Sequence, residues 1–331
     1  MGVILAPVNG KGTAERLVKA GAQELYMGFY DPAWAETFGM GAALNRMSGF
    51  GQEANTLSFQ ELLEEVTNLQ ASLNDQHLES PRLYCVFNAA GYSATQLAYI
   101  RQHYLPHLRE AGFAGIIVSG PDLIDAIHEQ GMQALASTMC SIYNEELARY
   151  YLQRGIDRAI LPRDLTLADI RSITAAVPQL EYEVFFMRNG CIFADSHCMG
   201  LHKAGCPSLC RSLRSAPAWN QYSAVGTQQP LNPWASAEND RLYREAFHQS
   251  ACGLCALWRF EQMGISAYKV VGRGDNHTEL FDDVTLSHAN LRIAKDCATE
   301  AEYLQRMLRP EGIRWLCDNQ GLSCYYPEVR F

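Results

Sequence analysis

Long hydrophobic runs are the first feature that this sequence of 331 residues lacks. No segment approaches the roughly 18 consecutive apolar residues that a transmembrane helix requires. The first residues, MGVILAPVNGKG, contain neither a basic region nor an extended apolar stretch, so we expect no signal peptide. These absences predict a cytoplasmic protein without membrane insertion, in a compartment where thiols stay reduced.

The sequence has fewer basic than acidic residues, and it lacks several familiar catalytic motifs. The formal net charge is −9, so the chain as a whole does not look like a nucleic-acid-binding protein, although Arg211 and Arg214 could form a local basic patch. The sequence contains no His-Glu-x-x-His and no Gly-x-Ser-x-Gly, which disfavours a zinc peptidase and a serine hydrolase. No G-x-G-x-x-G follows the first apolar run, which disfavours a dinucleotide-binding site.

Cysteine, by contrast, is plentiful, with 11 residues in total. Four of them, Cys191, Cys198, Cys206 and Cys210, form the pattern C-x6-C-x7-C-x3-C among Asp, His, Lys, Arg and Gly, which are poor core residues. Disulfides would require an oxidising compartment. We therefore predict that these four thiolates bind a metal, and they would suit either an iron–sulfur cluster or zinc. The spacing is not the paired C-x2-C of a zinc ribbon.

Two further cysteine pairs leave the ligand set open. Cys252 and Cys255 form C-x2-C near the start of a helical pattern, and one of them could replace one of the last two thiols of the loop. A structural role is the alternative for both. The C-x6-C spacing recurs at Cys317 and Cys324, but a single repeat of this kind is weak evidence for a metal site.

Eight short apolar runs alternate with helical patterns along the chain. They span residues 3–7, 24–28, 82–88, 115–119, 133–138, 158–163, 182–186 and 267–272. Because they are continuous rather than alternating, they are typical of buried parallel strands, and eight such units predict a (β/α)8 TIM-type barrel. An open doubly wound sheet is the alternative. We expect the barrel to span 1–309, with a cysteine-rich insertion at 189–263 after the seventh strand, and 310–331 to form a C-terminal tail.

Local signals predict where several helices begin and end. Ser58 followed by Glu61 forms a capping box, which predicts a helix that continues to Leu73. Residues 92–109 have a helical pattern that Pro106 should interrupt. A long helical region is expected over residues 282–308.

In a closed barrel, the residues that follow the strands meet at one mouth, where TIM-barrel enzymes bind their substrates. Arg163 and Arg273 end apolar runs, and each either pairs with a neighbouring aspartate or binds the carboxylate or phosphate of a substrate. Asn88, Ser137 and Thr138 are substrate-binding candidates by position, with helix capping as the alternative. The cysteine loop follows the seventh strand, so the predicted metal would lie over the same mouth.

Several segments together resemble peptidase family U32, the collagenase-like proteases, over about residues 3 to 296. The matching segments are LAPVNGKGTAERLVKAGAQELYMG (5–28), ASTMCSIYN (136–144), RAILPRDLTLADI (158–170), EVFFMRNGC (183–191), GCPSLCRS (205–212) and KVVGR (269–273). Two positions depart from the family pattern. Met187 and Arg188 replace a His-Gly pair, and Val271 replaces the Glu of Lys-Ile-Glu-Gly-Arg.

This resemblance implies a function that composition alone does not. Similar members of the family are implicated in oxygen-independent hydroxylation of ubiquinone precursors or of transfer and ribosomal RNA, and several carry a [4Fe–4S] cluster. We therefore expect an oxygen-independent hydroxylase, or a related modifying enzyme, that acts on an anionic small molecule or an RNA. The alternatives are a metal-dependent peptidase and a non-catalytic binding subunit with a structural metal. A hetero-oligomer with a related family member is also consistent with the resemblance.

Overall fold

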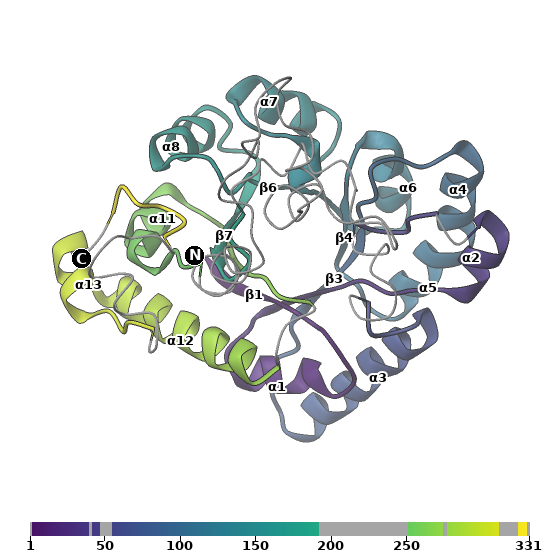
Figure 1. Cartoon of the computed structure of the whole chain (residues 1–331), viewed down its shortest axis with the longest axis horizontal. Coiled ribbons are helices and arrows are strands. Elements are labelled where there is room, and N and C mark those ends of the chain that lie inside the picture. The colour runs from purple at the N-terminus through teal and green to yellow at the C-terminus, as the bar shows by residue number, and fades with distance from the viewer. Residues whose placement is uncertain are drawn as a thin grey trace, which may run out of the picture.

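The computed structural model describes residues 2–39, 42–46, 55–191, 251–273, 277–310 and 324–329. Eight parallel strands close into a barrel in chain order, with helices around it (Figure 1). The strands are β1 Val3–Pro7, β2 Glu24–Met27, β3 Arg82–Phe87, β4 Gly115–Val118, β5 Gln133–Ala136, β6 Arg158–Ile160, β7 Glu181–Met187 and β8 Ala267–Val270. All eight lie on the predicted apolar runs, and the pairing of β1 with β8 confirms the (β/α)8 barrel over the open sheet.

The helices form the outer layer of the barrel (Figure 1). The α-helices within the described residues are α1 Thr13–Lys19, α2 Pro32–Phe38, α3 Phe59–Asp75, α4 Ala94–Tyr99, α5 Leu105–Glu110, α6 Ile124–Glu129, α7 Glu145–Gln153, α8 Leu167–Ala176, α11 Leu257–Met263, α12 His277–Asp296 and α13 Glu300–Arg306. Shorter helical elements are η2 Ile100–Tyr104, η3 Pro121–Leu123, η4 Thr138–Cys140 and η8 Leu254–Ala256. No helix in this part of the chain combines the length and the apolar composition needed to cross a membrane.

Two of the predicted helix signals are confirmed. Ser58 accepts from Glu61 N, and the Glu61 side chain accepts from Ser58 N, so the capping box starts α3. The helical pattern around Pro106 is interrupted as predicted, and η2, the interrupting element, is a turn of π-helix between α4 and α5. Proline has no N–H for the helical ladder, which explains the local change of hydrogen bonding.

The prediction of one long helical region over 282–308 was wrong in detail. α12 starts earlier, at His277, and ends at Asp296, and α13 begins as a separate helix at Glu300. Thr299 has an extended backbone, and its side chain accepts from Glu302 N. The extended backbone of Thr299 separates the two helices. Its hydroxyl begins α13 because it accepts from a backbone N–H of the first turn that has no partner within the helix.

Charged side chains line the interior of the barrel and pair across its strands. Arg158 of β6 donates from Nη1 and Nη2 to Glu24 of β2, at 2.5 and 3.0 Å. Glu183 of β7 lies 3.7 Å from the same guanidinium and accepts from Lys269 Nζ of β8 at 2.7 Å. The Tyr84 hydroxyl also donates to Glu24. Since these groups are buried, the two carboxylates and the two cations neutralise one another inside the barrel.

Replacing Arg158 with methionine would remove the cation that two buried carboxylates share. We expect Arg158→Met to lower the free energy of unfolding by about 3–5 kcal/mol, because it leaves buried charge uncompensated. Urea unfolding followed by circular dichroism measures this change. Arg154→Met, at an exposed arginine that caps α7, is the control and should change the value by less than about 0.5 kcal/mol. Equal effects of the two substitutions would contradict the shared pairing.

Candidate functional site

A chain of hydrogen bonds crosses the mouth of the barrel at the ends of β3 and β5. Asn88 Nδ2 donates to Ser137 Oγ at 3.2 Å, and Asn88 Oδ1 accepts from Arg46 N at 3.0 Å. Ser137 also caps η4 by accepting from Met139 N. Thr138 is buried beside it. The structure therefore brings Asn88, Ser137 and Thr138 together at the mouth of the barrel. Ser137 also caps a helix, which was the alternative role for these residues.

Arg163 follows β6, the strand next to β5, and its side chain contacts β7 and the turn after it. Its guanidinium carbon lies 4.0 Å from the centre of the Phe185 ring. Arg163 Nη1 donates to Asn189 O. This arginine therefore supports the backbone that follows β7.

The turn after β7 has an unusual backbone. Arg188 and Asn189 have φ values of 65° and 51°, a left-handed conformation that costs a non-glycine residue about 1–2 kcal/mol. Arg188 forms ion pairs with Glu279, at 2.6 Å, and with Asp283 of α12. The Tyr325 hydroxyl donates to Arg188 O. These contacts hold the turn and fix the direction in which the chain leaves the barrel.

Arg188 stands where the family motif that the sequence resembles has glycine. Glycine adopts a positive φ without strain, whereas arginine does so only when other contacts oppose the strain. The ion pairs to α12 provide that opposition. In this chain, the geometry of the turn therefore depends on side-chain contacts between β7 and α12.

Asp283→Asn tests whether these contacts hold the turn. Arg188 is buried, so we expect the loss of one charged partner to lower the free energy of unfolding by about 1–3 kcal/mol. Urea unfolding followed by tryptophan fluorescence is the measurement. Asp282→Asn, at an exposed neighbour on the same helix, should leave the value within about 0.5 kcal/mol. If both variants are equally stable, the pair between Arg188 and Asp283 does not stabilise the turn.

Residues 192–250 lie outside the described residues, and Ala251, which follows them, lies beside the end of β7. Arg188 N donates to Ala251 O at 2.7 Å, and Gly253 N donates to Phe186 O at 2.7 Å. This short antiparallel bridge places Cys252 directly opposite Met187. The first predicted ligand and the C-x2-C pair are therefore both attached to the same strand end.

Most of the predicted metal ligands cannot be placed. Cys198, Cys206 and Cys210, as well as Cys317, lie outside the described residues. Within the ranges that the structure describes, no three His, Cys, Asp or Glu side chains come together as a metal site. The metal site therefore stays a prediction.

The C-terminal segment 324–329 packs against this strand end as well. Cys324 forms a parallel bridge with Cys252, and Tyr325 N donates to Cys252 O at 2.9 Å. The Tyr326 hydroxyl donates to Phe185 O at 2.8 Å. A residue close to the C-terminus thus lies next to the C-x2-C pair. The spacing of the sequence offered only a weak signal for this proximity.

Arg273 follows β8, the strand next to β7, and its guanidinium lies against Gly28 at the end of β2. It is half-buried, and its Nη1 donates to Asn55 Oδ1 at 3.5 Å. Sequence reasoning missed Asn55 and Arg46, both in the long connection between β2 and α3. The unusual length of that connection was the available signal.

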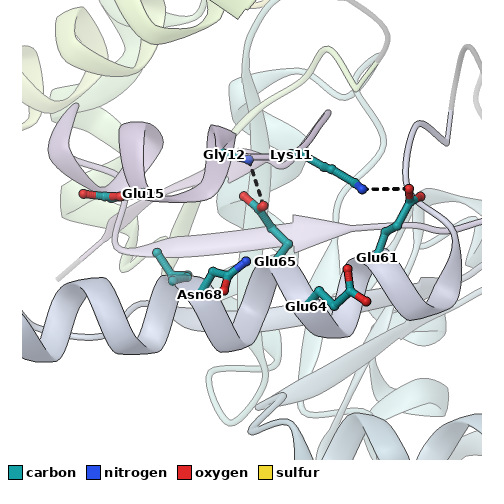
Figure 2. A pocket seen from close by; sticks show the side chains of 8 residues that line it. Lys11, Gly12, Glu15, Glu61, Glu64, Glu65 and Asn68 are labelled. Atoms are coloured by element: carbon teal, nitrogen blue, oxygen red, sulfur yellow. Dashed lines mark hydrogen bonds and ion pairs between the residues drawn. The ribbon is translucent and has the colours of Figure 1, made fainter.

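A hollow of about 180 Å³ lies away from these residues, between α1 and α3 (Figure 2). Glu65 of α3 accepts from Gly12 N at 2.8 Å and from Ala14 N at 3.1 Å. Lys11 pairs with Glu61 at 2.9 Å. Glu65 thereby caps a helix start that has no side-chain cap of its own. The polar groups of the hollow hold α1 against α3, and we assign it no ligand.

Fold and site together define a (β/α)8-barrel protein with a cysteine-rich insertion after its seventh strand. The model of peptidase family U32 matches residues 12–303. The chain therefore belongs to peptidase family U32.

Curated relatives of the chain include two tRNA hydroxylation proteins. It is 31% identical over 134 residues to tRNA hydroxylation protein P of Escherichia coli (strain K12), covering 40% of this chain and 29% of that protein. It is 25% identical over 185 residues to tRNA hydroxylation protein P1 of Bacillus subtilis (strain 168), covering 52% of this chain and 41% of that protein. The match thus spans less than half the length of each relative.

A solved structure from the same family is also similar to this chain. The U32 peptidase Mk0906 is 11% identical, with a TM-score of 0.42, covering 56% of this chain and 69% of that chain. A likeness of this size supports no conclusion about activity.

Proposed function

We propose that this protein is an iron–sulfur enzyme that modifies an anionic small molecule or an RNA, by oxygen-independent hydroxylation or a closely related reaction. The observation that carries the proposal is the arrangement at the end of β7. Cys191 follows this strand, and Cys252 pairs with it through the backbone, so both thiols are attached to the mouth of the barrel. TIM-barrel enzymes carry out their chemistry at this end.

The donor set fits a cluster. A [4Fe–4S] cluster takes four thiolates, and thiolates select iron–sulfur clusters or zinc over hard cations. The proposed ligands are the four thiols of the insertion, Cys191, Cys198, Cys206 and Cys210. Cys252 is the favoured replacement if one of them does not bind, because the bridge to Met187 holds it at the strand that leads to Cys191. Cys255 follows one helical turn after Cys252. Zinc is the alternative metal for this site.

The distant relationship to tRNA hydroxylation proteins supports a hydroxylation or a similar modification. When bound, a [4Fe–4S] cluster supplies one-electron transfer at the mouth of the barrel. In this proposal, Arg273 binds an anionic group of the substrate, while Asn88 and Ser137 orient polar groups beside it. Arg163 holds the turn before Cys191, and Thr138 supports Ser137 from the buried side.

Metal analysis of protein purified without oxygen tests the cofactor. We expect about four iron and four sulfide per chain, because that is the composition of the cluster. Cys191→Ala and Cys198→Ala should each lose most of the iron. Cys140→Ala, at a buried thiol whose Sγ contacts Val118 O, is the control and should retain it. Stoichiometric zinc without sulfide would overturn the proposal and favour a structural metal.

The identity of the fourth ligand follows from the same assay. Cys210→Ala should lose iron if the four thiols of the insertion bind the cluster. Loss of iron in Cys252→Ala or Cys255→Ala, with retention in Cys210→Ala, would show that the C-x2-C pair completes the coordination instead. Retention of iron in both Cys191→Ala and Cys198→Ala would remove the proposed site altogether.

The reaction can be tested in cells that lack the protein. We expect their RNA or small-molecule extracts to lack a hydroxylated species that the wild-type gene restores and the Cys191→Ala gene does not. Mass spectrometry of nucleosides and quinones, from cultures grown without oxygen, detects such a species. Hydrolysis of peptides by the metal-loaded protein, abolished by a chelator, would instead favour the peptidase alternative.

A further inference from the structure

Arg273 is a cation to which the described residues provide no carboxylate. Its hydrogen bond goes to the neutral amide of Asn55, and no described Asp or Glu forms an ion pair with it. Arg158, Lys269 and Arg188, by contrast, all pair with carboxylates. A desolvated cation without a counter-ion is costly, and an anion that binds beside it relieves that cost.

The surroundings of Arg273 increase the free-energy cost of burying its charge. Burial lowers the pKa of Arg273, and the neighbouring Arg46 lowers it further. The groups that oppose this shift are the Tyr26 phenol and the Cys85 thiol. Burial raises the pKa of Cys85 to about 12, so this thiol carries no negative charge at neutral pH.

The guanidinium of Arg273 lies against Gly28, the residue that follows β2. A Cβ at this glycine would lie 2.3 Å from Arg273 Nη1 and 2.8 Å from Asn55 Oδ1. Asn55 Nδ2 donates to Asn45 Oδ1 at 3.3 Å, and Asn45 Nδ2 donates to Phe29 O at 3.3 Å. Glycine thus makes room for the arginine, and two buried amides fix its position.

The carboxylate nearest to Arg273 in the sequence is Asp275, which lies outside the described residues. Residues 267–273, AYKVVGR, contain no carboxylate, and Val271 stands where the resembled family motif has glutamate. The described residues of this segment therefore offer Arg273 no counter-ion.

We propose that Arg273, held by Asn55 and with Arg46 nearby, binds a phosphate group of the substrate at the mouth of the barrel. A phosphate monoester carries about −1.5 to −2 charges at pH 7, which matches two neighbouring guanidiniums better than one carboxylate does. The guanidinium has five N–H donors in a planar fork, so donors remain beyond the one that Asn55 accepts. This inference deepens the proposed function, because it names the group by which the anionic substrate is held.

Calorimetric titration of anaerobically purified protein with inorganic phosphate, in a phosphate-free buffer, tests the site. We expect saturable binding to the wild type, and Arg273→Gln should weaken it by roughly tenfold to hundredfold, the usual worth of hydrogen bonds to a charged group. Arg273→Lys should fall between the two, because lysine keeps the charge but loses the planar fork. Arg306→Gln, at an arginine of α13 that pairs with Glu302, is the control and should bind as the wild type does.

Gly28→Ala tests whether phosphate binding depends on the position of the Arg273 guanidinium and not on its charge alone. The added methyl group would collide with Arg273 Nη1 and displace it, while the net charge of the protein is unchanged. We expect weaker phosphate binding without loss of the folded state, which circular dichroism and thermal unfolding would verify for each variant. Wild-type protein that binds no phosphate, or folded Arg273→Gln that binds it as tightly as the wild type, would overturn the site.

Competition experiments identify the molecule that carries the phosphate group. Iron measurements separate the phosphate-site proposal from the iron–sulfur proposal. Competition of a short RNA with a 5′-phosphate against inorganic phosphate, lost in Arg273→Gln and absent for the same RNA without that phosphate, would assign the site to a terminal phosphate of RNA. Competition by ribose 5-phosphate but not by RNA would assign it to a phosphorylated small molecule, and either result supports the site. Iron content is measured on the same samples. Phosphate binding by iron-free wild-type protein would leave this inference standing while the iron–sulfur proposal fails.

Discussion

The ion pairs inside the barrel are the constraint on which the rest of the structure depends. Arg158 connects β6 to β2 through Glu24, and Glu183 connects β7 to β8 through Lys269. A shift of one residue in any of these strands would turn a charged side chain out of the barrel and leave its partner buried without a counter-ion. The pairs therefore specify the register that brings the carboxyl ends of the strands to one mouth. They also leave this region electrically neutral, so positive charge at the mouth comes from residues beyond the strands.

From this register, β7 and β8 lead to two different environments. After β7, Arg188 takes a left-handed backbone conformation that α12 and the C-terminal segment hold in place. The bridge to Ala251 returns the chain to the same point and places Cys252 there. After β8, Arg273 lies against Gly28 with amides rather than carboxylates around it. The described thiols at the end of β7 and the cation after β8 therefore lie at the same mouth, as the proposed iron–sulfur enzyme requires for its cluster and its anionic substrate.

Elements with strong local signals were predicted correctly, and elements that depend on distant contacts were not. The strands were recognisable because buried parallel strands are continuous apolar runs, and α3 because Ser58 and Glu61 form a capping box from residues three apart. The break between α12 and α13 was missed, because a threonine within a polar helical pattern does not show in advance that it will cap a new helix. Asn88, Ser137 and Arg273 were predicted to lie at the mouth from their place after strands, and they do.

By itself, the sequence determined the class of fold, the end of the barrel where polar residues gather, and a group of thiols suited to a metal. These properties follow from local patterns of burial and spacing, which one stretch of chain carries alone. Only the tertiary structure decided which charges are neutralised and which are not. Arg158 begins β6 and Arg273 follows β8, and one meets Glu24 while the other meets Asn55, from segments more than a hundred residues away. Pairing of this kind depends on barrel closure, which brings distant strands together, and no local pattern encodes it.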